Sequence, residues 1–325
     1  MVWFNSQHCA VQVGDAPDVT WAQAPANIAL IKYMGKVGSA GNKPHNPSLS
    51  LTLMHHQVRV ELRPNEVWSW QPLVGFGEVP DLPEVAIQRF IKHAQYVANA
   101  VGLSQPMAIS SAGNFPMSCG LASSAASFAA LTAAIAYAAP SQSRTKSLVA
   151  LATLSQHGSG SSCRSWLQPW VVWDEEVASL STVWPSCLHR VVVVADQVKG
   201  VSSSQAHQRV PSSALFEGRL SRAKARLSTA KDCLSCGDWS QLYQLCWHEF
   251  WDMHALFHTA NPAFSYMVPA SLAVLNQVQQ YWQKFEDGPL VTMDAGANVH
   301  LIYRADQVQL RQHFDDLFAQ FYRLV

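Results

Sequence analysis

A run of small residues extends from Pro116 to Ala126, within the segment NFPMSCGLASSAASFAALTAA. Gly, Ala and Ser let a backbone approach a ligand closely. The run lies where a short strand at 107–112 is expected to give way to an Ala-rich helix at 120–138. The first N–H groups of such a helix have no partners within it, and the helix dipole adds partial positive charge. The run therefore predicts an anion site that needs no cationic side chain.

Two hydroxyls in this run, those of Ser123 and Ser124, can reach phosphate oxygens or a magnesium ion. The run is not a Walker motif, because no Gly-Lys-Ser/Thr follows it, and it is not a dinucleotide fingerprint. Its composition is equally typical of an Ala/Ser helix packed tightly against a sheet. The small residues by themselves therefore leave both phosphate binding and simple packing open.

The bulk composition is that of a globular protein. The 325 residues, 49% of them hydrophobic and 14% charged, allow about two domains with real cores. The formal net charge is zero, so we expect neither a nucleic-acid surface nor an electrostatic membrane anchor. Any anion site on this chain has to rely on local dipoles and a few placed cations.

The cysteines and the N-terminus indicate a reducing compartment. Seven cysteines without regular spacing argue against a disulfide framework. The opening residues MVWFNSQHCA have neither a basic nor an apolar signal region. The longest small and apolar run, at 122–139, carries several Ser and Thr and is short for a membrane span. We expect a cytoplasmic protein without a membrane segment.

Hydrophobic periodicity predicts mixed strands and helices, hence an α+β chain in two halves. The boundary is expected near 180–188, where polarity rises and Pro185 occurs. Segments typical of strands are 20–33, an antiparallel pair within 48–62, 107–112, 186–195, 289–294 and 300–305. Segments typical of helices are 82–101, 120–138, 143–156, 213–258 with a break near Cys236-Gly237, 265–285 and 306–323, and a loop is expected at 36–47.

One family accounts for the small-residue run and for segments elsewhere. The string P-x-x-x-G-L-A-S-S-A resembles the phosphate loop of the GHMP kinase superfamily. Further segments resemble one branch of it, the diphosphomevalonate decarboxylases, in the order of that family. They are APANIALIKYMGK (24–36), GSGSSCRSW (158–166), ADQVKGVSSSQ (195–205), HALFHTANPAFSYM (254–267) and MDAGANVHLIY (293–303). The resemblance covers nearly the whole chain.

The resemblance implies a GHMP kinase-like two-domain fold. Its N-terminal half, expected at 1–185, would be an ATP-binding domain similar to domain 2 of ribosomal protein S5. Its C-terminal half, expected at 186–325, would be ferredoxin-like. Members of the family are commonly homodimers, and this resemblance, together with a Trp-rich surface, also implies a homodimer.

The activity that the resemblance implies is ATP-dependent decarboxylation of mevalonate 5-diphosphate. The products would be isopentenyl diphosphate, ADP, phosphate and carbon dioxide, in the mevalonate pathway of isoprenoid biosynthesis. ATP would be a co-substrate and Mg²⁺ its metal ion. By the same resemblance, ATP would contact Asn114, Gly120, Leu121, Ala122, Ser123, Ser124 and Ala125, and Ser123 and Ser124 are the candidates for a magnesium contact.

Three residues are predicted to be catalytic. Asp294 is the candidate base for the substrate hydroxyl, because Ala-Gly-Ala after it lets the backbone turn and present a carboxylate. Lys32 lies in the apolar segment IALIKYMG, where a lysine is costly unless paired or used. We expect it close to Asp294, holding that carboxylate ionised. Arg164 can grip a carboxylate through two parallel hydrogen bonds.

The remaining predicted contacts are to the substrate. Ser159 and Ser161 can donate to the carboxylate or to the transferred phosphoryl group. The other residues follow from the resemblance: Asn27 would order the lysine and the substrate, and the diphosphate would meet Tyr33, Lys36, Ser202 and Ser203.

This chain departs from the family pattern mainly near the diphosphate end. Met34 replaces a tryptophan, Pro47 replaces a serine, and Ala297 replaces a proline beside the base. These changes leave the preference between a mono- and a diphosphate substrate open. A kinase of the same fold that phosphorylates mevalonate or its monophosphate also fits the motifs, and so does a non-catalytic nucleotide-binding scaffold. The presence of Asp294, Lys32 and Arg164 together favours decarboxylation.

Overall fold

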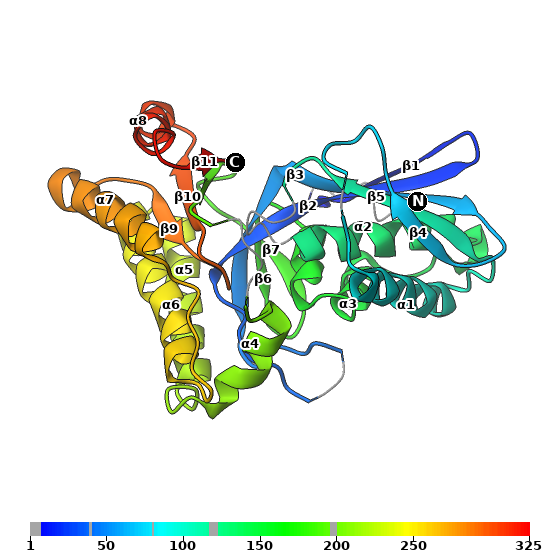
Figure 1. Cartoon of the computed structure of the whole chain (residues 1–325), viewed down its shortest axis with the longest axis horizontal. Helices are drawn as coiled ribbons and strands as arrows, with labels where there is room; N and C mark the ends of the chain where they lie inside the picture. The colour runs from blue at the N-terminus through cyan, green and yellow to red at the C-terminus, as the bar shows by residue number, and fades with distance from the viewer. Residues whose placement is uncertain (1–7, 39–40, 80, 117–122, 196–199) are drawn as a thin grey trace.

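The computed structural model describes residues 8–38, 41–79, 81–116, 123–195 and 200–325. The described part of the chain forms two sheets that lie side by side along the long axis, each with its own helices (Figure 1). The first sheet has the path β1-β2-β3-β5-β4, and β6 joins it by pairing with β3 and β7. Its strands are β1 Gln12–Ala16, β2 Val19–Ile31, β3 Ser48–Pro64, β4 Ser69–Pro72, β5 Met107–Gly113, β6 Trp170–Trp173 and β7 Val177–Leu180.

Three α-helices cover one face of this sheet (Figure 1): α1 Glu84–Val101, α2 Ser123–Ala138 and α3 Leu148–Gln156. Helix α2 packs against β2, β3 and α1, and its middle is buried all round. A helix that is apolar on every side is expected to be enclosed by other elements. Its many alanines allow this close packing, so α2 is a buried core helix whose first residues belong to the small-residue run.

The second sheet is antiparallel, with the order β11-β8-β10-β9. Its strands are β8 Cys187–Val193, β9 Leu290–Thr292, β10 Val299–Arg304 and β11 Arg323–Leu324. The helices of this half are α4 Ser203–Arg209, α5 Arg219–Cys236, α6 Trp239–Thr259, α7 Pro269–Phe285 and α8 Val308–Phe318. Helices α5 and α6 run beside the ends of β2 and β3, which extend toward them (Figure 1), so these two helices contact both halves of the molecule. The mixed α+β architecture in two halves agrees with the prediction.

The expected antiparallel pair within 48–62 is wrong. The residues form one continuous strand, β3, that pairs with β2, β5 and β6. A bulge separates its two alternating runs, because Ala26 pairs with Leu53 while Pro25 pairs with Gln57. The linking residues Met54-His55-His56 contain no Gly, Asn or Pro to make a hairpin turn. A bulge changes the phase of alternation without reversing the chain.

Other differences concern element ends and short elements. The helix expected at 143–156 begins only at Leu148, where the hydroxyl of Ser147 caps it. The helix expected from 265 begins at Pro269, and the break near Gly237 is confirmed, with φ of 87° at that residue. Periodicity does not predict strands β1, β4, β6, β7 and β11 or helix α4, since each is too short to show a clear period. No helix among the described residues combines the length and apolar character needed to cross a bilayer.

Candidate active site

The predicted base and the predicted lysine form an ion pair between the two halves. Lys32 directly follows β2 and is 1% exposed, and its Nζ lies 2.7 Å from Oδ1 of Asp294. Asp294 lies in a turn after β9, closed by a 2.8 Å hydrogen bond from the N–H of Gly296 to its carbonyl. Burial lowers the pKa of Lys32, and the carboxylate of Asp294 opposes that shift. The side chain of Asp294 remains 28% exposed, so the pair is open to a ligand on one side.

Arg164 is a buried guanidinium held by neutral groups. It is 2% exposed and donates to Oγ of Ser50 at 3.1 Å, to Oγ of Ser48 at 2.8 Å and to Oδ1 of Asn27 at 3.3 Å. Its hydrogen-bond partners within the described residues are therefore all uncharged. Burial lowers its pKa, with Asp294 among the groups that oppose this. A buried cation whose hydrogen-bond partners are all neutral can still bind an anion strongly.

Asn27 links Arg164 to the segment from which the arginine comes. Its amide donates to Oγ of Ser165 at 2.8 Å and to the carbonyl of Ser161 at 3.2 Å, while its oxygen accepts from Arg164. Asn27 is 1% exposed on β2, five positions before Lys32. One strand thus carries the residue that orients the arginine and leads directly into the lysine of the ion pair.

A row of hydroxyls connects this cluster to the start of α2. Oγ of Ser159 lies 3.2 Å from Oγ of Ser124 and 3.5 Å from Oγ of Ser161. Two glycines let the backbone of this segment pack closely against aromatic rings. A Cβ at Gly160 would lie 2.6 Å from the ring of Tyr33, and one at Gly158 would lie 2.1 Å from the ring of Phe128. The Gly-Ser-Gly-Ser pattern is therefore required by packing as well as by its hydroxyls.

The predicted nucleotide contacts are only partly described. Ser123 and Ser124 open α2, and Ala125 behind them is fully buried. Gly120, Leu121 and Ala122 lie outside the described residues. The exposed Asn114 lies just after β5 and uses its side chain to bond β3, accepting from the N–H of Gln57 at 2.7 Å and donating to the carbonyl of His55 at 2.9 Å.

Two predicted diphosphate contacts, Tyr33 and Lys36, flank a hydrogen bond that ties the chain after β2 to α4. The ring of Tyr33 packs 5.1 Å from that of Trp173 and 4.4 Å from that of His207, and its hydroxyl donates to the carbonyl of Asn42 at 3.2 Å. His207, on α4, accepts a 3.0 Å hydrogen bond from the N–H of Gly35. This tether brings α4 against the residues that precede Lys36.

Lys36 is half-buried, and burial followed by the charge of Arg89 lowers its pKa. Ser202 and Ser203 are exposed at the start of α4, where the hydroxyl of Ser202 accepts from the N–H of Gln205 and caps the helix. Met34, in place of the family's tryptophan, is 2% exposed within an apolar cluster that includes Phe257. The core is therefore filled at the position where the aromatic ring is missing.

Sequence reasoning missed residues that hold the site together. Ser48 and Ser50 on β3 are the acceptors of Arg164, and Asn46 donates to the carbonyl of Lys32 at 2.8 Å. Glu249 and Arg219, from α6 and α5, bond the main chain of Lys32. The sequence does offer a signal for Glu249, which is an acidic residue among the mostly aromatic and apolar residues of α6. Its partner Arg219 lies on another helix and has no sequence signature.

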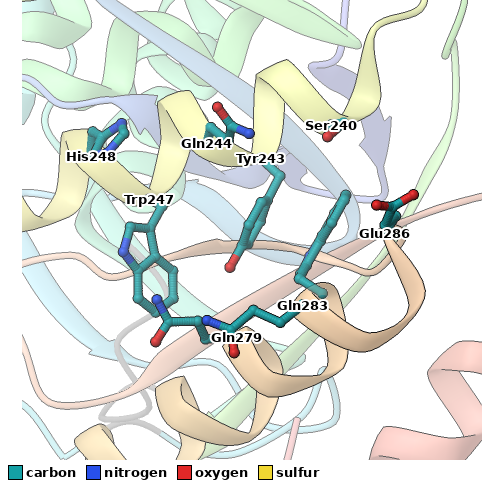
Figure 2. A pocket seen from close by; sticks show the side chains of 9 residues that line it. Ser240, Tyr243, Gln244, Trp247, His248, Gln279, Gln283 and Glu286 are labelled. Atoms are coloured by element: carbon teal, nitrogen blue, oxygen red, sulfur yellow. The ribbon is translucent and has the colours of Figure 1, made fainter.

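A separate hollow lies between α6 and α7 (Figure 2) and has a volume of about 680 Å³. Tyr243 stacks there on Trp282, with ring centroids 4.1 Å apart. None of the predicted site residues lines it. This hollow is therefore distinct from the cluster around Lys32.

Comparisons with known proteins identify the family that the chain resembles. Residues 24–183 match the diphosphomevalonate decarboxylase-like N-terminal domain, and residues 190–323 match the mevalonate 5-diphosphate decarboxylase C-terminal domain. The chain is 30% identical over 308 residues to the diphosphomevalonate decarboxylase of Gibberella zeae, covering 86% of this chain and 79% of the relative.

Solved structures give the same assignment. The crystal structure of a mevalonate diphosphate decarboxylase from Legionella pneumophila is 41% identical, with a TM-score of 0.88 over 94% of this chain and 100% of that one. The complex of MDDEF with MVAPP, AMPPCP and magnesium is 25% identical, with a TM-score of 0.81 over 94% and 95% of the two chains. This chain therefore belongs to the diphosphomevalonate decarboxylase family.

Proposed function

We propose that this chain catalyses the ATP-dependent decarboxylation of mevalonate 5-diphosphate to isopentenyl diphosphate, within the mevalonate pathway. The observation that carries the proposal is the buried Arg164 with neutral partners beside the Lys32–Asp294 pair. The names of the relatives and the two matched domain models support it. A substrate that bears both a carboxylate and a hydroxyl suits this guanidinium next to a carboxylate base.

In this proposal Asp294 accepts the proton of the 3-hydroxyl, and that oxygen then takes a phosphoryl group. Lys32 favours the ionised form of Asp294 because its ammonium lies 2.7 Å away. When the C–O bond to the new phosphate breaks, the electron pair of the C–C bond to the carboxylate forms the double bond and carbon dioxide leaves. Arg164 holds the carboxylate in the required orientation up to that point.

ATP and magnesium fit the start of α2. The hydroxyl of Ser124 is exposed there and lies 3.2 Å from that of Ser159, so nucleotide phosphates at this end would adjoin the substrate cluster. Ser123 and Ser124 are the proposed magnesium contacts. ATP supplies the phosphoryl group and the ion neutralises its charge. A relative has been solved with AMPPCP and magnesium, which supports this assignment.

The diphosphate is assigned to Tyr33, Lys36, Ser202 and Ser203. The half-buried Lys36 has no carboxylate partner within ion-pair distance in the described part of the chain, so its charge is available for a ligand. A relative solved with MVAPP supports a substrate of this kind. A monophosphate substrate would use the same lysine and fewer of the serine contacts.

Three further proposals concern the whole molecule. The boundary between the ATP-binding and C-terminal domains is placed at 185/186, between β7 and β8. The protein is proposed to be a homodimer, which sedimentation at several concentrations would test. A cytoplasmic location is proposed from the unspaced cysteines, and microscopy of the tagged chain would test it.

One assay tests the proposed function. The protein is supplied with ATP, magnesium and mevalonate diphosphate, and ADP, carbon dioxide and isopentenyl diphosphate are measured. Equal amounts of the three products are expected. ADP without carbon dioxide would identify a kinase, and the absence of ADP would favour the scaffold. A parallel reaction with the monophosphate measures which substrate is preferred.

A further inference from the structure

The main chain of Lys32 is held on both sides by a buried acid–base pair from the C-terminal half. The N–H of Lys32 donates to Oε1 of Glu249 at 2.9 Å, and its carbonyl accepts from Nη2 of Arg219 at 2.8 Å. Both side chains are fully buried. Arg219 also donates to both carboxylate oxygens of Glu249, so the two side chains and the main-chain N–H and C=O of Lys32 form a ring of contacts.

The pair continues outward into a chain of charges. Arg219 donates to Asp252 at 2.8 Å, and Arg226 donates to Glu249 at 2.7 Å and to Asp252 at 2.6 Å. Among the described residues, Arg222 forms ion pairs with Asp252 alone, and its side chain is 34% exposed. The cluster therefore has an inner pair that contacts Lys32 and an outer rim that does not.

A buried ion pair is a costly means of holding the main chain of one residue. Removing two charges from water costs several kcal/mol per ion before their attraction offsets it, so such pairs are weak evidence for stability alone. The N–H of Lys32 lies just beyond the last paired residue of β2, Ile31, and needs only a neutral acceptor. The charge of Glu249 has a second effect, because it is among the groups that raise the pKa of the buried Lys32 ammonium.

We propose that Glu249 and Arg219 are positioning residues for Lys32. They fix the main-chain N–H and C=O groups of the residue whose side chain reaches Asp294. The carboxylate of Glu249 also adds negative charge near the ammonium group, beside that of Asp294. The proposal rests on the proposed function, in which Lys32 supports the base. It also assigns to α5 and α6 the role of aligning the end of β2 with the turn that carries Asp294.

The first test is Glu249→Gln, which keeps the shape and removes the charge. We expect kcat to fall on the order of 10²-fold, because small misplacements of catalytic groups have effects of that size. The KM for ATP should stay within about twofold, since the nucleotide residues are untouched. The alkaline limb of the kcat profile should move to lower pH. Arg222→Met is the matched control, since it breaks an ion pair of the same cluster without touching Lys32.

The second test separates positioning from stability. The double variant Glu249→Leu/Arg219→Met replaces the buried pair by apolar residues, a change that is often neutral or stabilising. We expect its melting temperature to recover relative to Glu249→Gln while kcat stays low. Wild-type kcat, or an unmoved alkaline limb in the folded variants, would overturn the proposal.

A third measurement does not depend on turnover. The Nζ resonance of Lys32, assigned with Lys32→Met, can be titrated by NMR in the wild type and in Glu249→Gln. A lower pKa of Lys32 in the variant is expected, and an equal pKa would overturn the proposal even if no activity were detected. Absence of turnover in the wild-type protein would instead contradict the proposed function, so the two failures can be told apart.

Discussion

The ammonium nitrogen of Lys32 lies 2.7 Å from a carboxylate oxygen of Asp294, although the two residues are 262 positions apart in the chain. One residue follows a strand of the first sheet and the other follows a strand of the second. The site exists only when both halves are folded and aligned. This relationship makes the pair the most informative target for mutation.

Replacing Asp294 tests the proposed base. Asp294→Asn keeps the shape but cannot accept the hydroxyl proton, so we expect kcat to fall by about 10³-fold or more. The affinity for ATP, measured by calorimetry, should be nearly unchanged. Asp287→Asn is a matched control, because Asp287 also pairs with a cation but lies 47% exposed beside Arg304. Turnover of Asp294→Asn within tenfold of the wild type would contradict the role of the base.

Arg164 is expected to affect binding and turnover together. Arg164→Lys keeps the charge but cannot reach Ser48, Ser50 and Asn27 with one planar group. We expect KM for the substrate to rise and kcat to fall, because the carboxylate is held until it leaves. Steady-state kinetics at saturating ATP measure both values. A change in the KM for ATP alone would show that the arginine serves the nucleotide instead.

Gly160 tests the packing of the substrate cluster. Gly160→Ala would place a Cβ 2.6 Å from the ring of Tyr33, so the ring has to move from its place between Trp173 and His207. Since Tyr33 is a proposed diphosphate contact, we expect a higher KM for the substrate and a similar KM for ATP. Gly218→Ala is the control, because its Cβ meets only the flexible end of Arg222. Equal KM values for both variants would remove Tyr33 from the binding site.

The sequence allows the main site residues to be named but not the contacts that align them. Lys32 stands out as a charge in an apolar segment, and Asp294 as a carboxylate before a flexible turn. Arg219 lies on a helix with several other charged residues, and the burial of Glu249 and Arg219 depends on how two helices pack against β2. Local periodicity contains no information about such packing.

The bulge in β3 is a feature of the fold that the sequence pattern also fails to predict. The apolar positions change from odd numbers at Leu49, Leu51 and Leu53 to even numbers at Val58, Val60 and Leu62. That shift of phase suggests two strands, although the linking residues lack turn chemistry. A change of phase alone cannot distinguish a bulge from a hairpin, and here the absence of turn residues is the feature that favours the bulge.

Buried histidines are expected to make the protein sensitive to acid. His93 is 6% exposed and its Nε2 lies 3.0 Å from Oγ1 of Thr132, while His254 is fully buried among Phe250 and Phe257. Burial, as the largest cause, lowers the pKa of each to about 3. In the unfolded chain the pKa of histidine is about 6.5. Between these values the unfolded state binds more protons than the folded state, so stability falls as the pH falls.

The stabilisation is therefore complete above about pH 6.5 and is lost progressively toward pH 3. By pH 5 each buried histidine should lower the free energy of unfolding by about 2 kcal/mol relative to pH 8. Urea unfolding at pH 8, 6.5 and 5 measures this loss. His93→Leu should reduce the difference between pH 8 and pH 5 by about 2 kcal/mol, because one of the groups no longer takes up a proton on unfolding. His313→Leu is the control on the exposed face of α8. An unchanged pH dependence in His93→Leu would show that His93 is not held neutral by the fold.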